Sequence, residues 1–428
     1  MATLSDITSS FACRRPAALM PLVVAVLMLL SGCEQPTAPA TERELLRHEP
    51  DPQDSVSSDD YSRFQSYLGL TAYTSLAQAA QRAQQLDQRL SAFLHQPDAT
   101  HLVQVQSAWR QAYDAYLRSL VFAYLPINDP VEWRQKGIDY QSTLVLLDSW
   151  PVEGGYIDHV PGYPFSGIVN DLTLELTEDN LHSQHGFSDP SYASLGYHAL
   201  EFMLWGSNGD RDPADFVARE NTAPVVMPSE GQAAQSSDSE EHDATAAHLS
   251  GQVQNHNRRR QYIQLLSNQL MEHLQRLTRR WEPSNGYYSE LLEKTSAPQA
   301  TLATLIASQA LISREVLDRR LGNNSSEFSN TGTDDVIACL QSFTQLLSAT
   351  DHGQGMLSLI NDTQLVETWQ QQLAVLNSTL SQWQEQGMAS QELSQQVRSQ
   401  FIELLSLLEK TADALSMRLP RLDELSRR

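Results

Sequence analysis

The stretch "LAQAAQRAQQLDQRLSAF", residues 76–93, carries apolar residues at steps of three and four. This spacing places them on one face of a helix. Pro97 ends that helix, and Asp98 is placed to cap the next one, which carries its own apolar stripe. The short joint predicts an antiparallel helix pair. The two stripes consist of Leu76, Ala79, Ala83, Leu86, Leu90 and Phe93, and of Leu102, Val105, Trp109, Ala112, Tyr116 and Ala123.

Helical stripes also fill the second half of the chain, starting at Ile263, Val366 and Phe401. Residues 125–167 differ, because their prolines and glycines predict short helices and long loops. No alternating apolar pattern with hairpin turns indicates a strand. The sequence therefore predicts an all-α fold of two helical-bundle domains, residues 61–220 and 251–428.

The N-terminus has the pattern of an export signal. Arg14 and Arg15 precede the apolar run "ALMPLVVAVLMLL", whose 13 residues are too few for a membrane-spanning helix of about 20. The ending "LSGC" resembles a bacterial lipobox, which implies removal of residues 1–32 and lipidation of Cys33. The alternative is an ordinary secretory signal followed by an incidental cysteine.

Two segments lack a sustained apolar pattern. Residues 33–60 are rich in proline, serine and acids, and we interpret them as a flexible tether. Residues 221–250, which include "PSEGQAAQSSDSEEHDATAAHLSG", have almost no large apolar side chain. We interpret them as a disordered acidic and serine-rich insertion.

The charge balance excludes one class of partner. With 29 Lys and Arg against 52 Asp and Glu, the formal net charge is −23, so nucleic acid would be repelled. The three cysteines cannot build a disulfide framework or a cysteine metal cage, because one lies in the signal and one is the lipidation candidate. Cys339 is expected to be a small buried apolar residue.

The stretch "SLGYHALEFMLWGSNGD", residues 194–210, places two ionisable groups in an apolar run. His198 and Glu201 are three residues apart and share a helix face. They suit a divalent or ferric ion as ligands, or the carboxylate accepts a hydrogen bond from the imidazole and sets its tautomer. Both groups are expected to be buried with partners. The HExxH pattern of zinc peptidases is absent from the sequence.

The same stretch resembles the G-x-H-x-x-E signature of the imelysin family, matched by Gly196, His198 and Glu201. The segments "DSWPVEGGYID", "GDRDPADF" and "SSEFSNTGTDD" also resemble family segments, the last with loose spacing. The resemblance covers Tyr61 to about Leu380. Its matching positions outside the signature are Trp150, Pro151, Ile157, Asp158, Arg211, Asp215, Phe328, Ser329 and Asn330.

The resemblance implies an exported or lipid-anchored bacterial protein with two helical bundles and a site near the signature, in the cleft between them. It also implies two activities that do not agree. One is a peptidase of the insulin-cleaving type, and the other is iron acquisition.

The first hypothesis is a lipoprotein of the bacterial cell envelope, facing the periplasm or at the outer membrane, that binds a metal ion and takes part in iron acquisition. Iron comes first as the ion, with zinc or calcium as alternatives, and His198 and Glu201 are the ligands. Any transport would need separate membrane partners. Further candidate ligands, chosen by residue type and location, are Asp129, Asp158, Asp215 and Glu315; each is otherwise a solvated or salt-bridged acid.

Two alternatives remain open. A metallopeptidase would use Glu201 as general base, but then His198 is the one identified ligand, whereas catalytic zinc usually has three. The sequence therefore favours a protein without enzymatic activity, although it leaves the metallopeptidase open. The other alternative is a small-ligand-binding module with an aromatic-lined cleft. Arg211 and Asp215 have the spacing of an ion pair, and Ser329 is expected to cap a helix rather than face the cleft.

Overall fold

The structure is a computed structural model that describes residues 56–219, 255–350 and 353–420. All of these lie in one of two compact units of the chain, Pro52–Arg428. The predicted signal peptide (residues 1–32), the lipidation site Cys33, most of the tether and the insertion at 221–250 lie outside the described residues.

The described residues form helices and no strand ladder, so the all-α prediction is confirmed; their extended pairings are two isolated bridges. The longer helices are α1 (Ser58–His95), α2 (Ala99–Arg118), α9 (His256–Arg280), α11 (Ala297–Ala310), α12 (Gly332–Leu347), α13 (Thr363–Gln386) and α14 (Gln391–Ala414). The shorter ones are α3 (Val131–Gln135), α4 (Tyr140–Leu147), α5 (Gly154–Ile157), α6 (Glu178–Gln184), α7 (Tyr197–Trp205), α10 (Tyr287–Lys294), η1 (Leu120–Tyr124), η2 (Pro213–Phe216), η3 (Leu311–Arg320) and η4 (Met356–Leu359).

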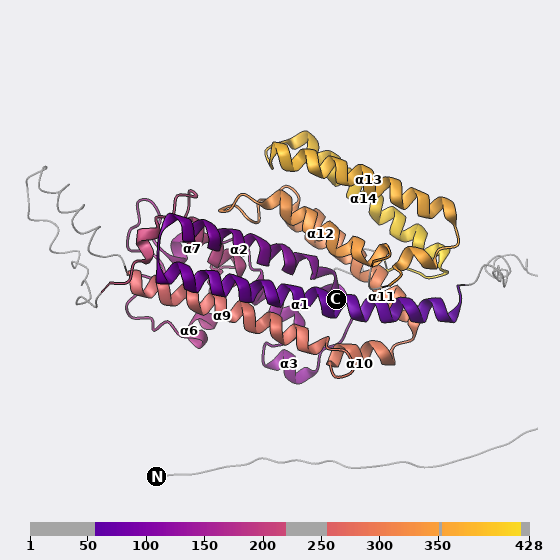
Figure 1. Ribbon diagram of the computed structural model, residues 1–428, viewed down its shortest axis with the longest axis horizontal. Helices are drawn as coiled ribbons and strands as arrows, with labels where there is room; N and C mark the ends of the chain where they lie inside the picture. The colour runs from indigo at the N-terminus through magenta and orange to yellow at the C-terminus, as the bar shows by residue number, and fades with distance from the viewer. Residues whose placement is uncertain (1–55, 220–254, 351–352, 421–428) are drawn as a thin grey trace, which may run out of the picture. The chain divides into compact units, whose positions relative to one another are not determined.

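Helix α1 and helix α2 form the predicted pair. α1 ends at His95, ahead of Pro97, and the Asp98 side chain caps α2 by accepting a hydrogen bond of 2.8 Å from the His101 backbone N–H. Every residue of both predicted stripes is buried. α1 packs against α2 on one side and against α9 on another (Figure 1), so helices far apart in the sequence share the α1 core.

The later helices extend this core. α12 packs against α2, and α11 packs against α1. α13 and α14 form a second pair, coloured yellow in Figure 1, which contacts α12 through α13 and α11 through α14. The segments before and after the insertion therefore share packing surfaces, and the division into bundles over 61–220 and 251–428 stays a prediction.

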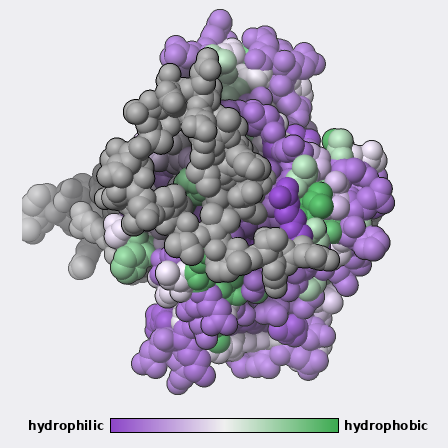
Figure 2. All heavy atoms as spheres, turned by 90° about the vertical axis from the view of Figure 1, so that its left-hand side faces the viewer, coloured by the Kyte–Doolittle hydropathy of each residue, from purple (hydrophilic) through white to green (hydrophobic). Residues whose placement is uncertain are grey.

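The surface of the described residues is mainly polar. In Figure 2, the part of the face not covered by grey atoms is mostly hydrophilic, and its hydrophobic side chains lie in small separate groups. The large apolar side chains that are exposed come from several different elements, including Leu70, Val145 and Val375. Within the described ranges, no helix combines the length and the apolar character that crossing a membrane requires.

Candidate functional site

A glycine brings the end of α4 next to the start of α7. Gly196 precedes α7 with a φ of 94°, and a Cβ at this position would lie 2.6 Å from the Leu147 carbonyl oxygen. A side chain is excluded both by this contact and by the left-handed backbone. Because Asp148 follows Leu147 directly, the close approach brings it to His198, two residues after the glycine.

His198 lies between two carboxylates, and none of the three side chains reaches solvent to a useful extent. Its Nδ1 is 2.8 Å from Glu201 Oε2, and its Nε2 is 3.1 Å from Asp148 Oδ1. His198 and Glu201 are fully buried, and Asp148 is 4% exposed. The Tyr113 hydroxyl, from α2, lies 2.9 Å from His198 Nε2 and donates to Asp148 Oδ1 over 2.9 Å. We call Tyr113, Asp148, His198 and Glu201 the His198 cluster.

The two carboxylates keep His198 protonated. Burial alone would lower the pKa of this imidazole, but its hydrogen bonds to Asp148 and Glu201 and their charges raise the pKa to about 9. Burial would also raise the pKa of Asp148, yet the charges of Arg319 and Arg320 hold it below its usual range. At neutral pH the ring is therefore an imidazolium that donates a hydrogen bond from each nitrogen.

Each carboxylate of the cluster has one oxygen facing His198 and a second oxygen that accepts hydrogen bonds from residues outside the cluster. Glu201 Oε1 accepts from the Ser329 backbone N–H at 2.8 Å and from the Ser329 hydroxyl at 2.6 Å. Asp148 Oδ2 accepts from Arg320 at 2.7 Å and from Arg319 at 3.4 Å. The prediction that Ser329 caps a helix is wrong. Its hydroxyl donates a hydrogen bond to Glu201, and no side chain caps the N-terminus of α12.

The arginines come from η3, a π-helix, whose wider turn is often found at functional positions. Arg320 is fully buried, and besides Asp148 it lies 3.3 Å from Glu315 and 3.8 Å from Asp335. Burial raises the pKa of Asp335 to about 6, although Arg320 and two serine hydroxyls oppose the shift. We call Glu315, Arg319, Arg320 and Asp335 the arginine network. The candidate residue Glu315 thus belongs to it and pairs with cations.

Three other candidate residues form a separate ion cluster around Asp158. This fully buried carboxylate accepts from Arg259 at 2.6 and 2.8 Å and from Arg211 at 3.3 Å. Arg211 also pairs with Asp215 at 3.2 Å, which confirms the predicted ion pair. Arg211 further donates to the Phe202 carbonyl of α7 at 3.4 Å, so this Asp158 cluster supports the helix that carries His198.

Asp129 lies outside these clusters and joins two other helices. Its carboxylate accepts from the Tyr140 backbone N–H at 2.9 Å and from the Tyr288 hydroxyl at 2.7 Å. These bonds connect the start of α4 to α10. Asp129 therefore has a structural role, and among the described residues it makes no hydrogen bond or ion pair to the His198 cluster.

In the described parts of the chain, no three His, Cys, Asp or Glu side chains are arranged to hold a metal ion. In the His198 cluster, protons occupy the positions between imidazole and carboxylates. Loss of a proton from Nδ1 would expose an imidazole lone pair beside Glu201 Oε2. The arrangement can therefore hold a proton and, on its release, offer one nitrogen and one oxygen ligand.

Sequence reasoning missed six charged or hydroxyl side chains of these clusters: Tyr113, Asp148, Arg259, Arg319, Arg320 and Asp335. A weak signal existed for three of them. Tyr113 follows Trp109 by four residues on the same helix face. Asp148 begins the quoted segment "DSWPVEGGYID", and Asp335 ends the quoted segment "SSEFSNTGTDD". The arginines lie in ordinary polar helical surroundings, and nothing local marks them as buried.

The protonation of His198 predicts how stability depends on pH. The pKa of about 9 in the fold exceeds the value of 6.5 for an ordinary histidine, so the protonated ring stabilises the fold fully below pH 6.5. This contribution is lost as the pH rises through 9. At about 1.4 kcal/mol per pKa unit it amounts to roughly 3 kcal/mol. We expect urea denaturation with a chelator to show this loss between pH 6 and pH 9.

A His198→Gln variant provides the control, because it removes the group that titrates between pH 6 and pH 9. Asp335, which remains, has its pKa raised to about 6, at the lower end of that interval. Identical pH slopes for the variant and the wild type would contradict the assignment of an imidazolium.

The comparisons with known proteins agree with the fold. A family model described as imelysin, peptidase M75, matches residues 70–417. A solved structure from Parabacteroides distasonis, named a "putative iron-regulated protein A precursor", shares 15% identity with a TM-score of 0.55, covering 84% of this chain and 96% of that chain. At this identity the likeness shows the fold alone. The search of curated proteins found no match. Since the family model spans most of the sequence, the chain belongs to the imelysin family.

Proposed function

We propose that this protein is a lipid-anchored protein of the bacterial cell envelope that binds iron and takes part in iron acquisition, with His198 and Glu201 as ligands. Support comes from membership of the imelysin family and from a fold shared with a protein whose name refers to iron regulation. The anchor at Cys33 rests on the lipobox-like "LSGC". Transfer of iron across a membrane would require separate membrane proteins as partners.

The observation that carries the proposal is the orientation of the two carboxylates around one buried imidazole. Glu201 Oε2 and His198 Nδ1 are 2.8 Å apart and lie on one helix face. Asp148 accepts from the opposite ring nitrogen, the position that a carboxylate takes behind a metal-bound histidine. Ser329 fixes the other oxygen of Glu201. Oxygen and imidazole ligands of this kind suit iron.

Another carboxylate lies close enough to Glu201 to respond to its charge. Glu327 lies two residues before Ser329, and both burial and the negative charge of Glu201 raise its pKa. A cation placed between these groups would relieve their repulsion. Asp158 and Asp215 are engaged by arginines and leave the ligand set of the proposal. Glu327 would join it only by moving towards the pair, because no three such side chains are arranged to hold a metal ion in the described residues.

No feature of the described residues favours the peptidase alternative. A general base needs a free carboxylate oxygen to take a proton from water. Both oxygens of Glu201 are engaged, one by Ser329 and one by His198. Iron binding would instead exchange the His198 proton for the ion, with Glu201 Oε2 as an oxygen ligand and not as a base.

Calorimetric titration of the full-length protein with ferrous, ferric, zinc and calcium ions tests the proposal. We expect one iron ion per chain, preferred over zinc and calcium. A His198→Ala/Glu201→Ala double variant should bind iron at least about 100-fold more weakly, since each removed ligand group costs at least about tenfold.

The matched control is His101→Ala, which removes the histidine of a half-exposed pair with Asp98, also three residues apart and 2.8 Å between its atoms. This control should bind iron like the wild type. If the wild type binds none of the four ions, or if the folded double variant binds iron equally well, the proposal fails. Zinc preference together with peptide hydrolysis would favour the metallopeptidase.

A further inference from the structure

A second site lies between α4, α6 and α9, and shares no residue with the His198 cluster. It is a cleft of about 960 Å³, lined by residues of the α3–α4 loop and of these three helices. Three basic side chains line it, namely Lys136, Arg276 and Arg279, and none of them has an ion-pair partner within the described part of the chain. Unpaired cations in a chain of net charge −23 are unexpected.

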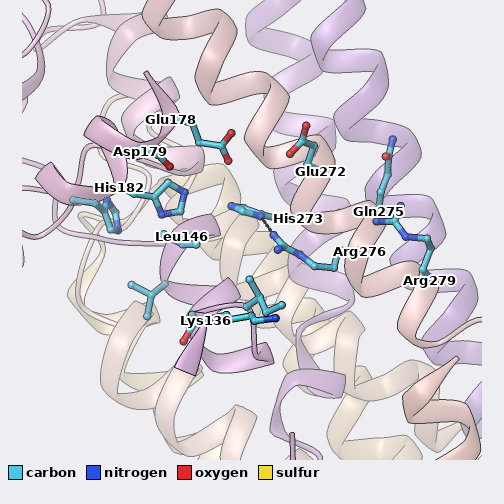
Figure 3. A pocket seen from close by; sticks show the side chains of 15 residues that line it. Lys136, Leu146, Glu178, Asp179, His182, Glu272, His273, Gln275, Arg276 and Arg279 are labelled. Carbon is cyan, nitrogen blue, oxygen red and sulfur yellow. Dashed lines mark hydrogen bonds between the residues drawn. The ribbon is translucent and has the colours of Figure 1, made fainter. Parts of the chain in front are cut away.

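A buried histidine points into this cleft with one nitrogen unsatisfied. His273 is 4% exposed, and its Nε2 has no hydrogen-bond partner. Figure 3 shows its ring directed towards His182, with Arg276 on the opposite side. The two imidazole rings are 6.3 Å apart between centroids. A buried polar atom without a partner costs free energy, so it marks a position where a ligand group fits.

The tautomer of His273 follows from its contact with Arg276. A guanidinium only donates hydrogen bonds, so His273 Nδ1, which contacts the Arg276 terminal nitrogen, accepts. Burial, with the nearby charge of Arg276, lowers the pKa of His273 to about 3, so the ring is neutral. Its one proton is therefore on Nε2, and the unsatisfied atom is a donor. The Nε of Arg276 is a second buried donor without a partner.

Two unsatisfied donors and three unpaired cations call for an acceptor that carries negative charge. A metal ion would need a lone pair on His273 Nε2, which this tautomer does not have. Three acids, Glu178, Asp179 and Glu272, also line the cleft. Burial lowers the pKa of Arg276, and the charges of Glu272 and Glu178 act on it in the opposite direction. The two unsatisfied donors therefore carry the inference, with the basic side chains offsetting the acids of the lining.

We propose that this cleft binds a small ligand through an oxyanion group, a carboxylate or a phosphate, which accepts from His273 Nε2 and from Arg276. Lys136 and Arg279 supply further positive charge at its edge. Binding here does not depend on iron binding at His198, because the two sites have no residue in common.

Equilibrium titration of the full-length protein with inorganic phosphate and, separately, with citrate tests this inference. We expect saturable binding of at least one of them at one site per chain. His273→Phe keeps the ring volume and removes the donor, and Arg276→Gln removes the charge. Each should weaken binding by roughly 10- to 100-fold, the loss expected for a hydrogen bond to a charged group. Binding of phosphate alone or of citrate alone identifies which oxyanion the site accepts.

The matched control is Arg89→Met, which changes an arginine that lines a different surface depression and should leave binding unchanged. If His273→Phe fails to fold, Arg276→Gln, a half-exposed position, gives the same test. Absence of saturable binding of both anions to the wild type would overturn the inference, as would unchanged binding in folded Arg276→Gln. Zinc binding that requires both His182 and His273 would overturn it in favour of a metal site.

Discussion

An Arg320→Met variant is expected to lose about 3–5 kcal/mol of unfolding free energy, because it breaks a buried ion pair by removing one partner. Arg320 is fully buried and contacts the carboxylates of Asp148, Glu315 and Asp335 at 2.7, 3.3 and 3.8 Å. Methionine fills a similar volume without the charge. The loss therefore reports the uncompensated carboxylates rather than a cavity, and urea denaturation at pH 7 measures it.

Two arginine variants calibrate this result. Arg319→Met removes the neighbouring arginine, which contacts Asp148 at 3.4 Å but is 27% exposed, so a smaller loss is expected. Arg134→Met changes an exposed side chain and should stay within about 0.5 kcal/mol of the wild type. If Arg320→Met were as stable as Arg134→Met, the arginine network would not hold the charges described.

The second large effect is expected for Asp158→Asn. The substitution keeps the shape of the side chain but removes the charge that faces Arg259 and Arg211. Both guanidinium groups are almost fully buried, with side chains 1% and 3% exposed. An uncompensated buried cation costs about 3–5 kcal/mol, and we expect a loss of this size in urea denaturation.

A double-mutant cycle separates this pairing from general damage. The double variant Asp158→Asn/Arg259→Met should lose less unfolding free energy than the sum of the two single losses, by more than about 1 kcal/mol. The reason is that each single substitution already removes the same ion pair. Asp413→Asn, the same substitution at an exposed position of α14, should be nearly neutral. Additive losses would show that Asp158 and Arg259 stabilise the fold independently.

The helices could be predicted from the sequence because their signals are local. The apolar stripe from Leu76 to Phe93, the stop at Pro97 and the cap at Asp98 all depend on neighbours within a few residues. The burial of His198 and Glu201 was predictable for the same reason, since the apolar residues around them belong to one short helix.

The partners of this pair could not be predicted, because they come from distant parts of the chain. Arg320 reaches Asp148 across 172 positions, and Ser329 reaches Glu201 across 128. Ser329 also shows how a local rule fails. A serine just before a helix often caps it, but here the hydroxyl donates to the buried carboxylate of Glu201, which would otherwise lose this hydrogen bond. The close approach that requires Gly196 is likewise a contact between segments.

Anomalous diffraction at the iron absorption edge, from crystals of the full-length protein loaded with ferrous ion, tests the central claim most directly. The account predicts an iron peak within bonding distance of His198 Nδ1 and Glu201 Oε2, with Asp148 still accepting from the opposite nitrogen. An iron peak elsewhere, with His198 still hydrogen-bonded to both carboxylates as in the structure described here, would contradict it.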